Sequence, residues 1–144
     1  MTQSNTRRGD RLIQAGIDLR GMEGCVVMLG CTQTEPHTPI VLPPATSIDA
    51  PLYVILEGAA AGELASVRPL TPARNVRLKL AYGCNPGEAL IANINDGRDG
   101  TVVAFTPNGA VGTFRGIAIA EEAGTDGQLI LARPAPIGLL VITG

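Results

Sequence analysis

The sequence predicts an all-β protein, specifically a small β-barrel or sandwich built from two similar units, with an extended N-terminal arm. Three observations support this prediction. Short aliphatic runs are separated by Asn/Asp/Gly/Pro clusters at roughly the 8 to 12 residue spacing of sandwiches and barrels. Gly116–Pro134 contains two such runs around Asp126-Gly127, a pair that supplies the positive φ of a hairpin turn. A related pattern occurs earlier in the chain.

The two copies of this pattern are Gly62–Pro69 (Gly-Glu-Leu-Ala-Ser-Val-Arg-Pro) and Gly127–Pro134 (Gly-Gln-Leu-Ile-Leu-Ala-Arg-Pro). They are related by a constant shift (127 − 62 = 65). The same shift places Glu23 on Glu88 (88 − 23 = 65). The sequence therefore predicts a duplicated strand-rich unit, which favours a binding or structural role.

We expect three segments in chain order: an arm over residues 1–14, a first β unit over 15–82 and a second β unit over 83–144. The joint falls at Gly83–Gly87, which is rich in turn residues. Two such units can pair their open edges and close a common core, giving one compact domain with pseudo-twofold symmetry.

Composition limits what the protein can bind. At 144 residues the chain can bury ~70% of its unfolded surface, so it can form a stable core without disulfides or a structural metal. Hydrophobic residues make up 45% but aromatic residues only 3%, so the core is aliphatic and few large side chains remain to line a deep ligand pocket. The net charge of −2 gives no general attraction to nucleic acid or to an anionic membrane. We therefore expect neither as a partner.

The sequence also indicates a reducing compartment. No apolar run approaches the ~18 residues of a membrane span, and the N-terminus lacks the apolar stretch of a secretory signal. The sequence has an odd number of cysteines, Cys25, Cys31 and Cys84, and they lack CxxC spacing. This favours reduced thiols over a disulfide framework. We expect a protein that is made and kept in a cytoplasm.

The first unit opens with two short runs, Ala15–Leu19 and Cys25–Leu29. Glycines bound the second run, which is typical of a buried strand. Residues 32–51 contain five prolines, which lack the donor that a central strand needs. This stretch is predicted as a long surface loop with at most one edge strand, Ile40–Leu42.

A hairpin is predicted next, with Leu52–Leu56 pairing with Glu63–Val67 across a turn at Gly58–Gly62. The turn contains three alanines that favour a helix, but each flanking glycine costs about 1 kcal/mol in a helix interior. The equivalent turn of the second unit carries Asp126-Gly127, which decides for a hairpin.

The remaining strands follow the same logic. Val76–Leu80 alternates apolar with basic residues, so a strand there buries its three apolar side chains and exposes Arg77 and Lys79. The second unit then contributes five predicted strands, which are Ala89–Ile94, Thr101–Phe105, Gly116–Ala120, Gln128–Ala132 and Ile137–Ile142.

Catalytic and metal-binding candidates have simpler explanations. His37 is the only histidine, and no serine, cysteine or carboxylate is placed beside it for acid–base work, so a solvated loop residue is favoured. With Cys25, Cys31 and Cys84 it forms a zinc set by residue type. Their spacing matches no usual ligand pattern, which favours cysteines packed in the core.

Two acidic segments fail as sites for similar reasons. Asn93–Gly100 gathers oxygen ligands as a calcium loop does, but a register begun at Asn95 puts Thr106 where the bidentate acid belongs. A β-turn is favoured there. Glu121 and Glu122 would leave a strand on opposite faces, which makes them a poor acid/base pair. We expect no catalytic residue, no cofactor and no metal.

Five arginines are the candidates for partner contact. Arg68 and Arg133 occupy equivalent points of the two units, where matched guanidinium groups could meet an acidic partner surface. The favoured alternative is that their stems pack on the barrel and their heads bond local carbonyls. Arg7, Arg8 and Arg11 lie in the arm, which is either a disordered tail or a segment that orders against a neighbouring subunit.

Six short stretches within residues 15–133 occur in an order found in a known protein family. They are Ala15-Gly16-Ile17-Asp18-Leu19, Val26-Val27-Met28-Leu29, Pro51-Leu52-Tyr53-Val54-Ile55-Leu56, Gly62-Glu63-Leu64-Ala65-Ser66-Val67, Pro86-Gly87-Glu88-Ala89-Leu90 and Gly116-Ile117-Ala118-Ile119-Ala120-Glu121-Glu122-Ala123. In them the chain resembles the capsid decoration, or cement, proteins of tailed bacteriophages. It departs from that pattern at Tyr53, where a glycine is expected, and in the length of the loop over residues 32–51.

The resemblance implies a small β-rich protein that attaches to the outside of a phage head and reinforces it against the pressure of packaged DNA. It implies the major capsid protein as partner, trimers on the shell, and a place on the virion exterior after assembly in the host cytoplasm. In that setting the five arginines are candidate contacts with the capsid or with a neighbouring subunit.

Three functions compete on these grounds. The first is a non-enzymatic structural protein whose β-body clamps the shell and whose arm reaches a neighbour. The second is a small β-barrel module that binds a ligand or carbohydrate, which the low aromatic content disfavours. The third, an enzyme, would need a cofactor that the sequence does not announce.

Overall fold

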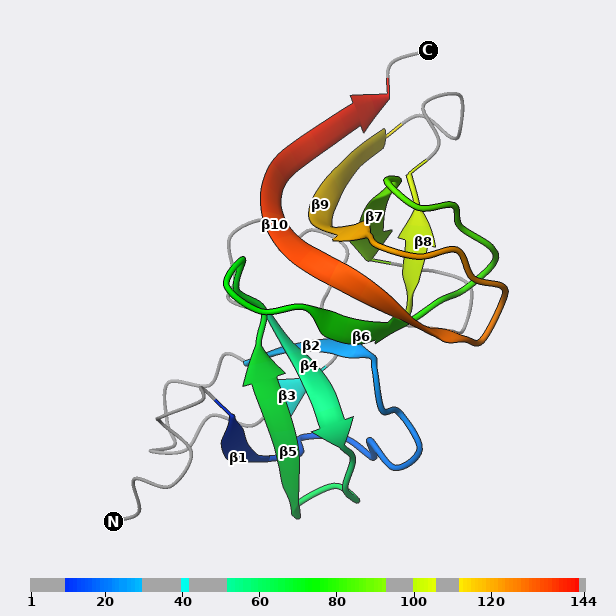
Figure 1. Cartoon of the computed structure of the whole chain (residues 1–144). Coiled ribbons are helices and arrows are strands. Elements are labelled where there is room, and N and C mark those ends of the chain that lie inside the picture. Colours follow the sequence, from blue (N-terminus) through cyan, green and yellow to red (C-terminus); the bar gives the residue numbers. More distant parts are fainter. Residues whose placement is uncertain (1–9, 30–39, 42–51, 93–99, 106–111, 143–144) are drawn as a thin grey trace.

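The computed structural model describes residues 10–29, 40–41, 52–92, 100–105 and 112–142 (Figure 1). These residues form ten β-strands and no helix, arranged as two antiparallel five-stranded sheets. The described part of the chain therefore offers no helix that could cross a membrane. The strands are β1 (Arg11–Gln14), β2 (Val26–Leu29), β3 (Ile40–Val41), β4 (Leu52–Glu57), β5 (Leu64–Pro69), β6 (Val76–Lys79), β7 (Ala89–Ala92), β8 (Val102–Ala104), β9 (Gly112–Ala120) and β10 (Leu129–Ile142).

The two sheets have the same internal order. The first runs β1-β5-β4-β2-β3 and the second β6-β10-β9-β7-β8, so adding five to each strand number converts one order into the other. The partner residues repeat as well: Ile13 lies opposite Ala65, and Leu78 lies opposite Ile130, a shift of 65 for each (78 − 13 and 130 − 65). The predicted all-β fold built from two similar units is confirmed.

Local sequence produces the repeated hairpins. Gly62 and Gly127 have φ of 87° and 83°, the left-handed conformation that glycine adopts without a Cβ penalty. Each ends the turn between two paired strands, β4 with β5 and β9 with β10. The alternative of a helix at residues 59–61 is excluded by this pairing.

The shift is not uniform, which corrects one part of the sequence alignment. Val26 lies opposite Val54, whereas Ala89 lies opposite Ile119, so β2 corresponds to β7 at a shift of 63 (89 − 26) while β4 corresponds to β9 at 65 (119 − 54). Glu23 therefore does not correspond to Glu88. The register in the structure differs from the sequence match by two residues, because the turn before β2 is two residues longer than the turn before β7.

In this register Gly24 corresponds to Gly87, with φ of 86° and 88°. The backbone N–H of Gly24 donates to Ile55 O at 2.9 Å, and that of Gly87 donates to Ala120 O at 2.7 Å. The two glycines thus enter β2 and β7 through the same hydrogen-bonded turn.

The predicted arm ends earlier than residue 14. Arg11–Gln14 form β1, the edge strand paired with β5, and Ile13 is buried against the core. Leu12 and Gln14 face outward, so a four-residue strand with one buried side chain shows no hydrophobic period in the sequence. Residues 1–9 lie outside the described part of the chain.

The division between units also moves. β6 was predicted in the first unit, before a boundary at residue 82, but it pairs with β10 and belongs to the second sheet. The units therefore divide between Pro69 and Val76. The predicted alternation in β6 is correct for Val76 and Leu78, which are buried, and for Arg77, which is exposed, whereas Lys79 was expected to be exposed and is half-buried.

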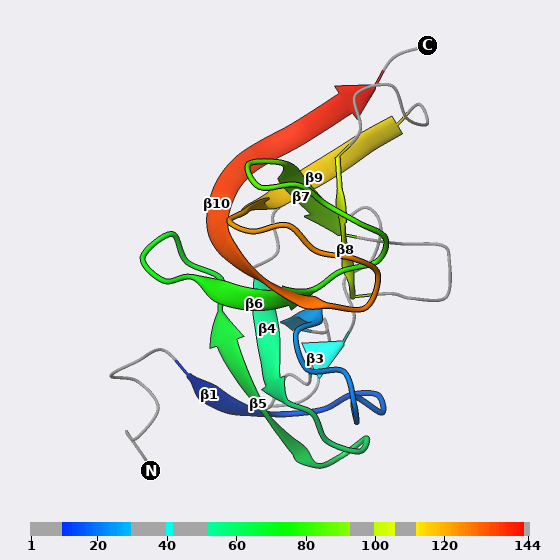
Figure 2. The same cartoon turned by 45° about the vertical axis from the view of Figure 1, so that its right-hand side comes forward.

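The last predicted pair of strands is a single one. Gln128–Ala132 and Ile137–Ile142 were expected as separate strands, but both lie in β10, whose pairing with β9 shifts between Pro134 and Gly138. Proline has no N–H to donate, so the ladder is interrupted at Pro134-Ala135-Pro136 and resumes with β9 at Gly138. β10 bends sharply along its length, as both views show (Figures 1 and 2).

The predicted strand Ile40–Leu42 appears as β3, at the edge of the first sheet. The rest of the predicted loop over residues 32–51 lies outside the described part of the chain. The strands predicted at Ala89–Ile94 and Thr101–Phe105 appear as β7 and β8 with shorter bounds.

Two hydrophobic clusters hold the sheets together. The inner cluster lies within the first unit and includes Tyr53 and Ile55 of β4. The shared cluster combines the opposite face of β4, with Leu52 and Val54, with the core of the second sheet. Four successive side chains of β4 are thus buried on alternating faces. The units join through the outer face of β2 and β4 rather than through a symmetric pairing of open edges.

The backbone reinforces this junction at Gly24. The N–H of Lys79 donates to Gly24 O at 2.9 Å, and the N–H of Val26 donates to Gly100 O at 2.8 Å. A Cβ at position 24 would overlap Leu129 Cδ2 and lie 3.1 Å from Lys79 N. The second unit therefore approaches this turn as closely as a glycine allows.

We predict that Gly24→Ala destabilises the fold more than Gly87→Ala does. Both substitutions place alanine at positive φ, which costs about 1–2 kcal/mol. Only the first also overpacks the junction, because a Cβ at Gly87 meets no atom within 4 Å. Overpacking adds about 1–3 kcal/mol. Urea denaturation of the two variants measures the difference, and equal losses would contradict the junction at Gly24.

Candidate interaction surface

Three leucines stand exposed on the outer face of the first sheet, the face opposite the inner cluster. Leu12, Leu56 and Leu64 are 56%, 37% and 62% exposed. They lie on the adjacent strands β1, β5 and β4, and Ser66 lies opposite both Leu12 and Glu57. The register shift between Ile55 and Glu57 makes Leu56 the extra residue of β4 at this point, beside Glu57. Neighbouring side chains on one face of a sheet lie close enough to form a continuous surface. We call these three residues the leucine patch.

The second sheet treats the equivalent positions differently. A shift of 65 relates Leu12 to Arg77, Leu56 to Glu121 and Leu64 to Leu129. Two leucines of the first unit are therefore replaced by charged residues in the second, where each charge has a partner: Arg77 pairs with Glu122, and Glu121 pairs with Arg133. Sequence reasoning missed the leucine patch, although this comparison of the two copies was available to find it.

The predicted contact arginines are engaged within the chain. Arg68 donates to both carboxylate oxygens of Asp10, with Nε–Oδ1 at 2.7 Å and Nη2–Oδ2 at 3.1 Å. These hydrogen bonds raise the pKa of Arg68. Arg133 Nε lies 3.1 Å from Glu121 Oε1. Each guanidinium bonds a carboxylate of its own chain rather than local carbonyls, so a partner would have to compete with that bond.

The three described arginines of this set do not gather into one basic surface. Arg11 and Arg68 lie on the paired strands β1 and β5, and Arg11 Nη1 donates to Tyr53 Oη at 3.3 Å. Arg133 lies on β10 in the other sheet. Arg7 and Arg8 fall outside the described residues.

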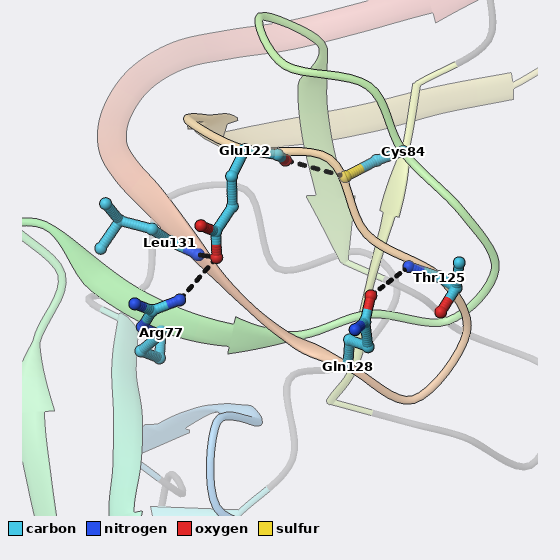
Figure 3. Close-up of polar contacts among 6 residues, drawn as sticks. All are labelled: Arg77, Cys84, Glu122, Thr125, Gln128 and Leu131. Carbon is cyan, nitrogen blue, oxygen red and sulfur yellow. Dashed lines mark hydrogen bonds and ion pairs between the residues drawn. The ribbon is translucent and has the colours of Figure 1, made fainter.

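The β9–β10 turn is tied down by its own polar side chains (Figure 3). Glu122 Oε1 accepts from Leu131 N at 2.8 Å and also from Arg77. Gln128 Oε1 accepts from Thr125 N at 2.7 Å. Glu121 and Glu122 follow the end of β9 rather than lying in a strand, and each forms an ion pair, Glu121 with Arg133 and Glu122 with Arg77.

A hollow of about 580 Å³ opens beside this turn on the second unit. Tyr82 stands at it with φ of 67°, a conformation that side-chain-bearing residues rarely adopt. Its backbone N–H donates to Asp126 Oδ1 at 3.3 Å, which helps to hold that conformation. The residues that line the hollow are Tyr82, Gly83, Cys84, Asn85, Glu88, Val103, Ala104 and Gly124.

The two described cysteines are packing residues. Cys25 and Cys84 are buried free thiols, and burial raises the pKa of each. Among the residues that the structure describes, no three His, Cys, Asp or Glu side chains are grouped to hold a metal. Cys31, His37 and residues 93–99 of the calcium-like segment lie outside that part of the chain.

Comparison with known proteins places the fold. No family model matches the sequence, and no curated protein matches it. Among solved structures, the fold is similar to the crystal structure of the head fiber gp8.5 N base in bacteriophage phi29. The two share 18% sequence identity with a TM-score of 0.63, over 91% of this chain and 97% of that one. At this identity the similarity shows a common two-sheet architecture.

We predict a measurable coupling between Arg68 and Asp10, and a smaller one between Arg133 and Glu121. The first pair is bidentate and its side chains are 22% and 25% exposed, whereas the second pair is 56% and 33% exposed. Exposed pairs contribute about 0–1 kcal/mol, and the better-ordered pair should lie at the upper end of that range. Double-mutant cycles in urea measure both couplings. A larger coupling for Arg133 would contradict the assignment.

We also predict that Cys25 and Cys84 react slowly with iodoacetamide at pH 8 in the folded protein. Burial limits access and keeps both thiols protonated, and the thiolate is the reacting form. Both should react quickly in urea. Peptide mass spectrometry gives the rate for each site, and rapid labelling of either one in the native protein would show that it is accessible.

Proposed function

We propose that this chain is a non-enzymatic structural protein of a phage virion that binds the outer surface of the capsid and stabilises it. Its partner is the major capsid protein, and it acts on the shell as a homo-oligomer, with the trimer as the expected form. The observation that carries the proposal is the fold shared with a phage head fiber base over nearly the full length of both chains. The resemblance of its sequence to capsid decoration proteins supports it independently.

The architecture suits attachment to a lattice. Two similar units share one core, so the chain is a stiff body whose outer faces can each touch a different neighbour. We propose that these units are two copies of one module, since their strand order and most of their register repeat. Many copies on a rigid shell bind with high avidity even when each contact is weak.

The N-terminal residues are the surface we assign to capsid contact. Arg7 and Arg8 precede β1, an edge strand of the first sheet. Capsid contact through these residues would place that edge of the first sheet toward the shell.

The hollow beside Tyr82 supports a second candidate function, a ligand- or carbohydrate-binding module. Tyr82 is 53% exposed at the edge of a space of about 580 Å³, and sugars stack on exposed aromatic rings. This function predicts that a glycan panel contains a ligand that raises the melting temperature and that Tyr82→Ala abolishes the effect. A flat panel would dismiss it.

Co-sedimentation with isolated phage capsids that lack the protein tests the first proposal. We predict that the wild-type chain binds these capsids and raises the temperature at which they release packaged DNA. The double variant Arg7→Ala/Arg8→Ala should bind several-fold more weakly, whereas Arg20→Ala, an exposed arginine paired with Asp18 two residues away, should bind as wild type does.

Two results separate the parts of this proposal. Failure of the wild-type chain to bind any capsid would overturn the function. Binding of the Arg7→Ala/Arg8→Ala variant at wild-type strength would remove the N-terminal residues from the contact and leave the function intact.

A further inference from the structure

We propose that copies of this chain associate head to tail by repeating, between chains, the contact that Leu129 makes with the turn at Gly24 where its two sheets meet. In this contact the leucine patch of one copy packs against the turn at Gly87 in the second unit of another copy. Leu64 takes the place that Leu129 holds within the chain, and Gly87 takes the place of Gly24.

The internal contact supplies the template. Within one chain, Leu129 of the second unit lies against the turn at Gly24 of the first, so closely that any Cβ there would overlap its side chain. The N–H of Lys79 donates to Gly24 O at 2.9 Å. The contact thus has three parts: a leucine, a backbone N–H donor on the neighbouring strand, and a glycine turn. The turn packs against the leucine and accepts the hydrogen bond from the N–H.

Each of these three features has an equivalent among the residues that the structure describes. Leu64 corresponds to Leu129 (129 − 64 = 65) and is 62% exposed. Gln14 corresponds to Lys79 (79 − 14 = 65), lies opposite Leu64 and belongs to edge strand β1. Gly87 corresponds to Gly24, has the same φ, and has open space where a Cβ would stand.

The composition of the patch favours an occupied surface. Where the second unit carries the paired charges Arg77 and Glu121, the first carries Leu12 and Leu56. Both of these leucines are exposed in the single chain, and burying them gains free energy in proportion to the apolar area covered. The charged residues on the second sheet are well solvated by water. The leucines on the first sheet would gain free energy if a partner covered them.

The opposite side of the contact has room to receive them. The hollow of about 580 Å³ adjoins Gly87, since Asn85 and Glu88 belong to its wall. Val103 and Ala104 give this wall apolar surface. Leucine side chains that approach Gly87 therefore meet a concave surface on the second unit.

The two halves of the contact cannot meet within one chain. The start of β5, which carries Leu64, lies at the lower end of the molecule, and the start of β7, which follows Gly87, lies in its upper half (Figures 1 and 2). The contact is therefore heterologous, with a different surface on each partner. Such contacts produce rings where the rotation closes and open chains where it does not.

This inference deepens the self-association named in the proposed function, but it concerns the purified chain alone. We expect sedimentation velocity to show oligomers of the wild-type protein whose fraction rises with protein concentration. Measurements up to about 1 mM protein detect dissociation constants of about 1 mM or below. Leu64→Ser and Gly87→Ala should each raise the dissociation constant by about tenfold or more, since each removes one side of the contact.

Gly127→Ala is the matched control for Gly87→Ala. Gly127 has φ of 83° and open space at its Cβ, so the two variants carry the same backbone strain in the fold. Only the variant at position 87 should lose self-association. Equal loss in both would show that strain, not the contact, is responsible and would overturn the proposal.

Mixing the variants gives the decisive result. Leu64→Ser retains an intact Gly87 surface, and Gly87→Ala retains an intact leucine patch, so the mixture should form heterodimers although neither variant associates alone. A symmetric contact between two leucine patches would instead be abolished by Leu64→Ser and unchanged by Gly87→Ala. That pattern, or a wild-type chain that stays monomeric throughout, would overturn the inference and leave capsid binding untouched.

Discussion

Burial of the first sheet on both faces is the constraint on which the rest of this structure depends. The outer side chains of β2 and β4, which are Val26, Met28, Leu52 and Val54, join the core of the second sheet. Burying one such side chain contributes about 1.5–3 kcal/mol, whereas an exposed ion pair contributes about 0–1 kcal/mol. Aliphatic packing therefore decides how the units sit, and the ion pairs at Asp10 and Glu121 adjust the surface. The glycine at position 24 is what allows the backbones to come this close.

Repetition inside one chain creates an asymmetry that a single unit would not have. The surfaces around Gly24 and Leu129 are in contact where the units meet. Their equivalents around Gly87 and Leu64 lie apart from that junction. Repeat proteins commonly give such terminal faces a polar covering, because an uncovered apolar face aggregates. The second sheet follows this rule with Arg77 and Glu121, whereas the first sheet has Leu12 and Leu56 at the equivalent positions. This contrast between leucines and paired charges is the clearest difference between the described surfaces of the two sheets.

The fold is compatible with the structural role that we propose. A body held by strands from both ends of the chain resists deformation, and its β10 strand, which passes Pro134 without leaving the sheet, ties the C-terminal half together. A phage head fiber base shares this two-sheet architecture. The predicted arginine contacts are less direct than expected, since Arg68 and Arg133 already bind carboxylates of their own chain. The leucines provide the better candidates for contact.

The sequence by itself determined what depends on neighbouring residues. Turn glycines at Gly62 and Gly127, the alternation in β6 and the aliphatic run of β4 each carry a local signal, because φ preference and side-chain period are properties of short segments. Tertiary structure alone decided the membership of β6 in the second sheet, the edge strand β1, the shift of 63 between β2 and β7, and the continuity of β10. These features follow from pairing between residues far apart in sequence. The exposure of Leu64 at 62% and of its equivalent Leu129 at 46% is of the same kind, because only the packed neighbours determine how much of a leucine meets water.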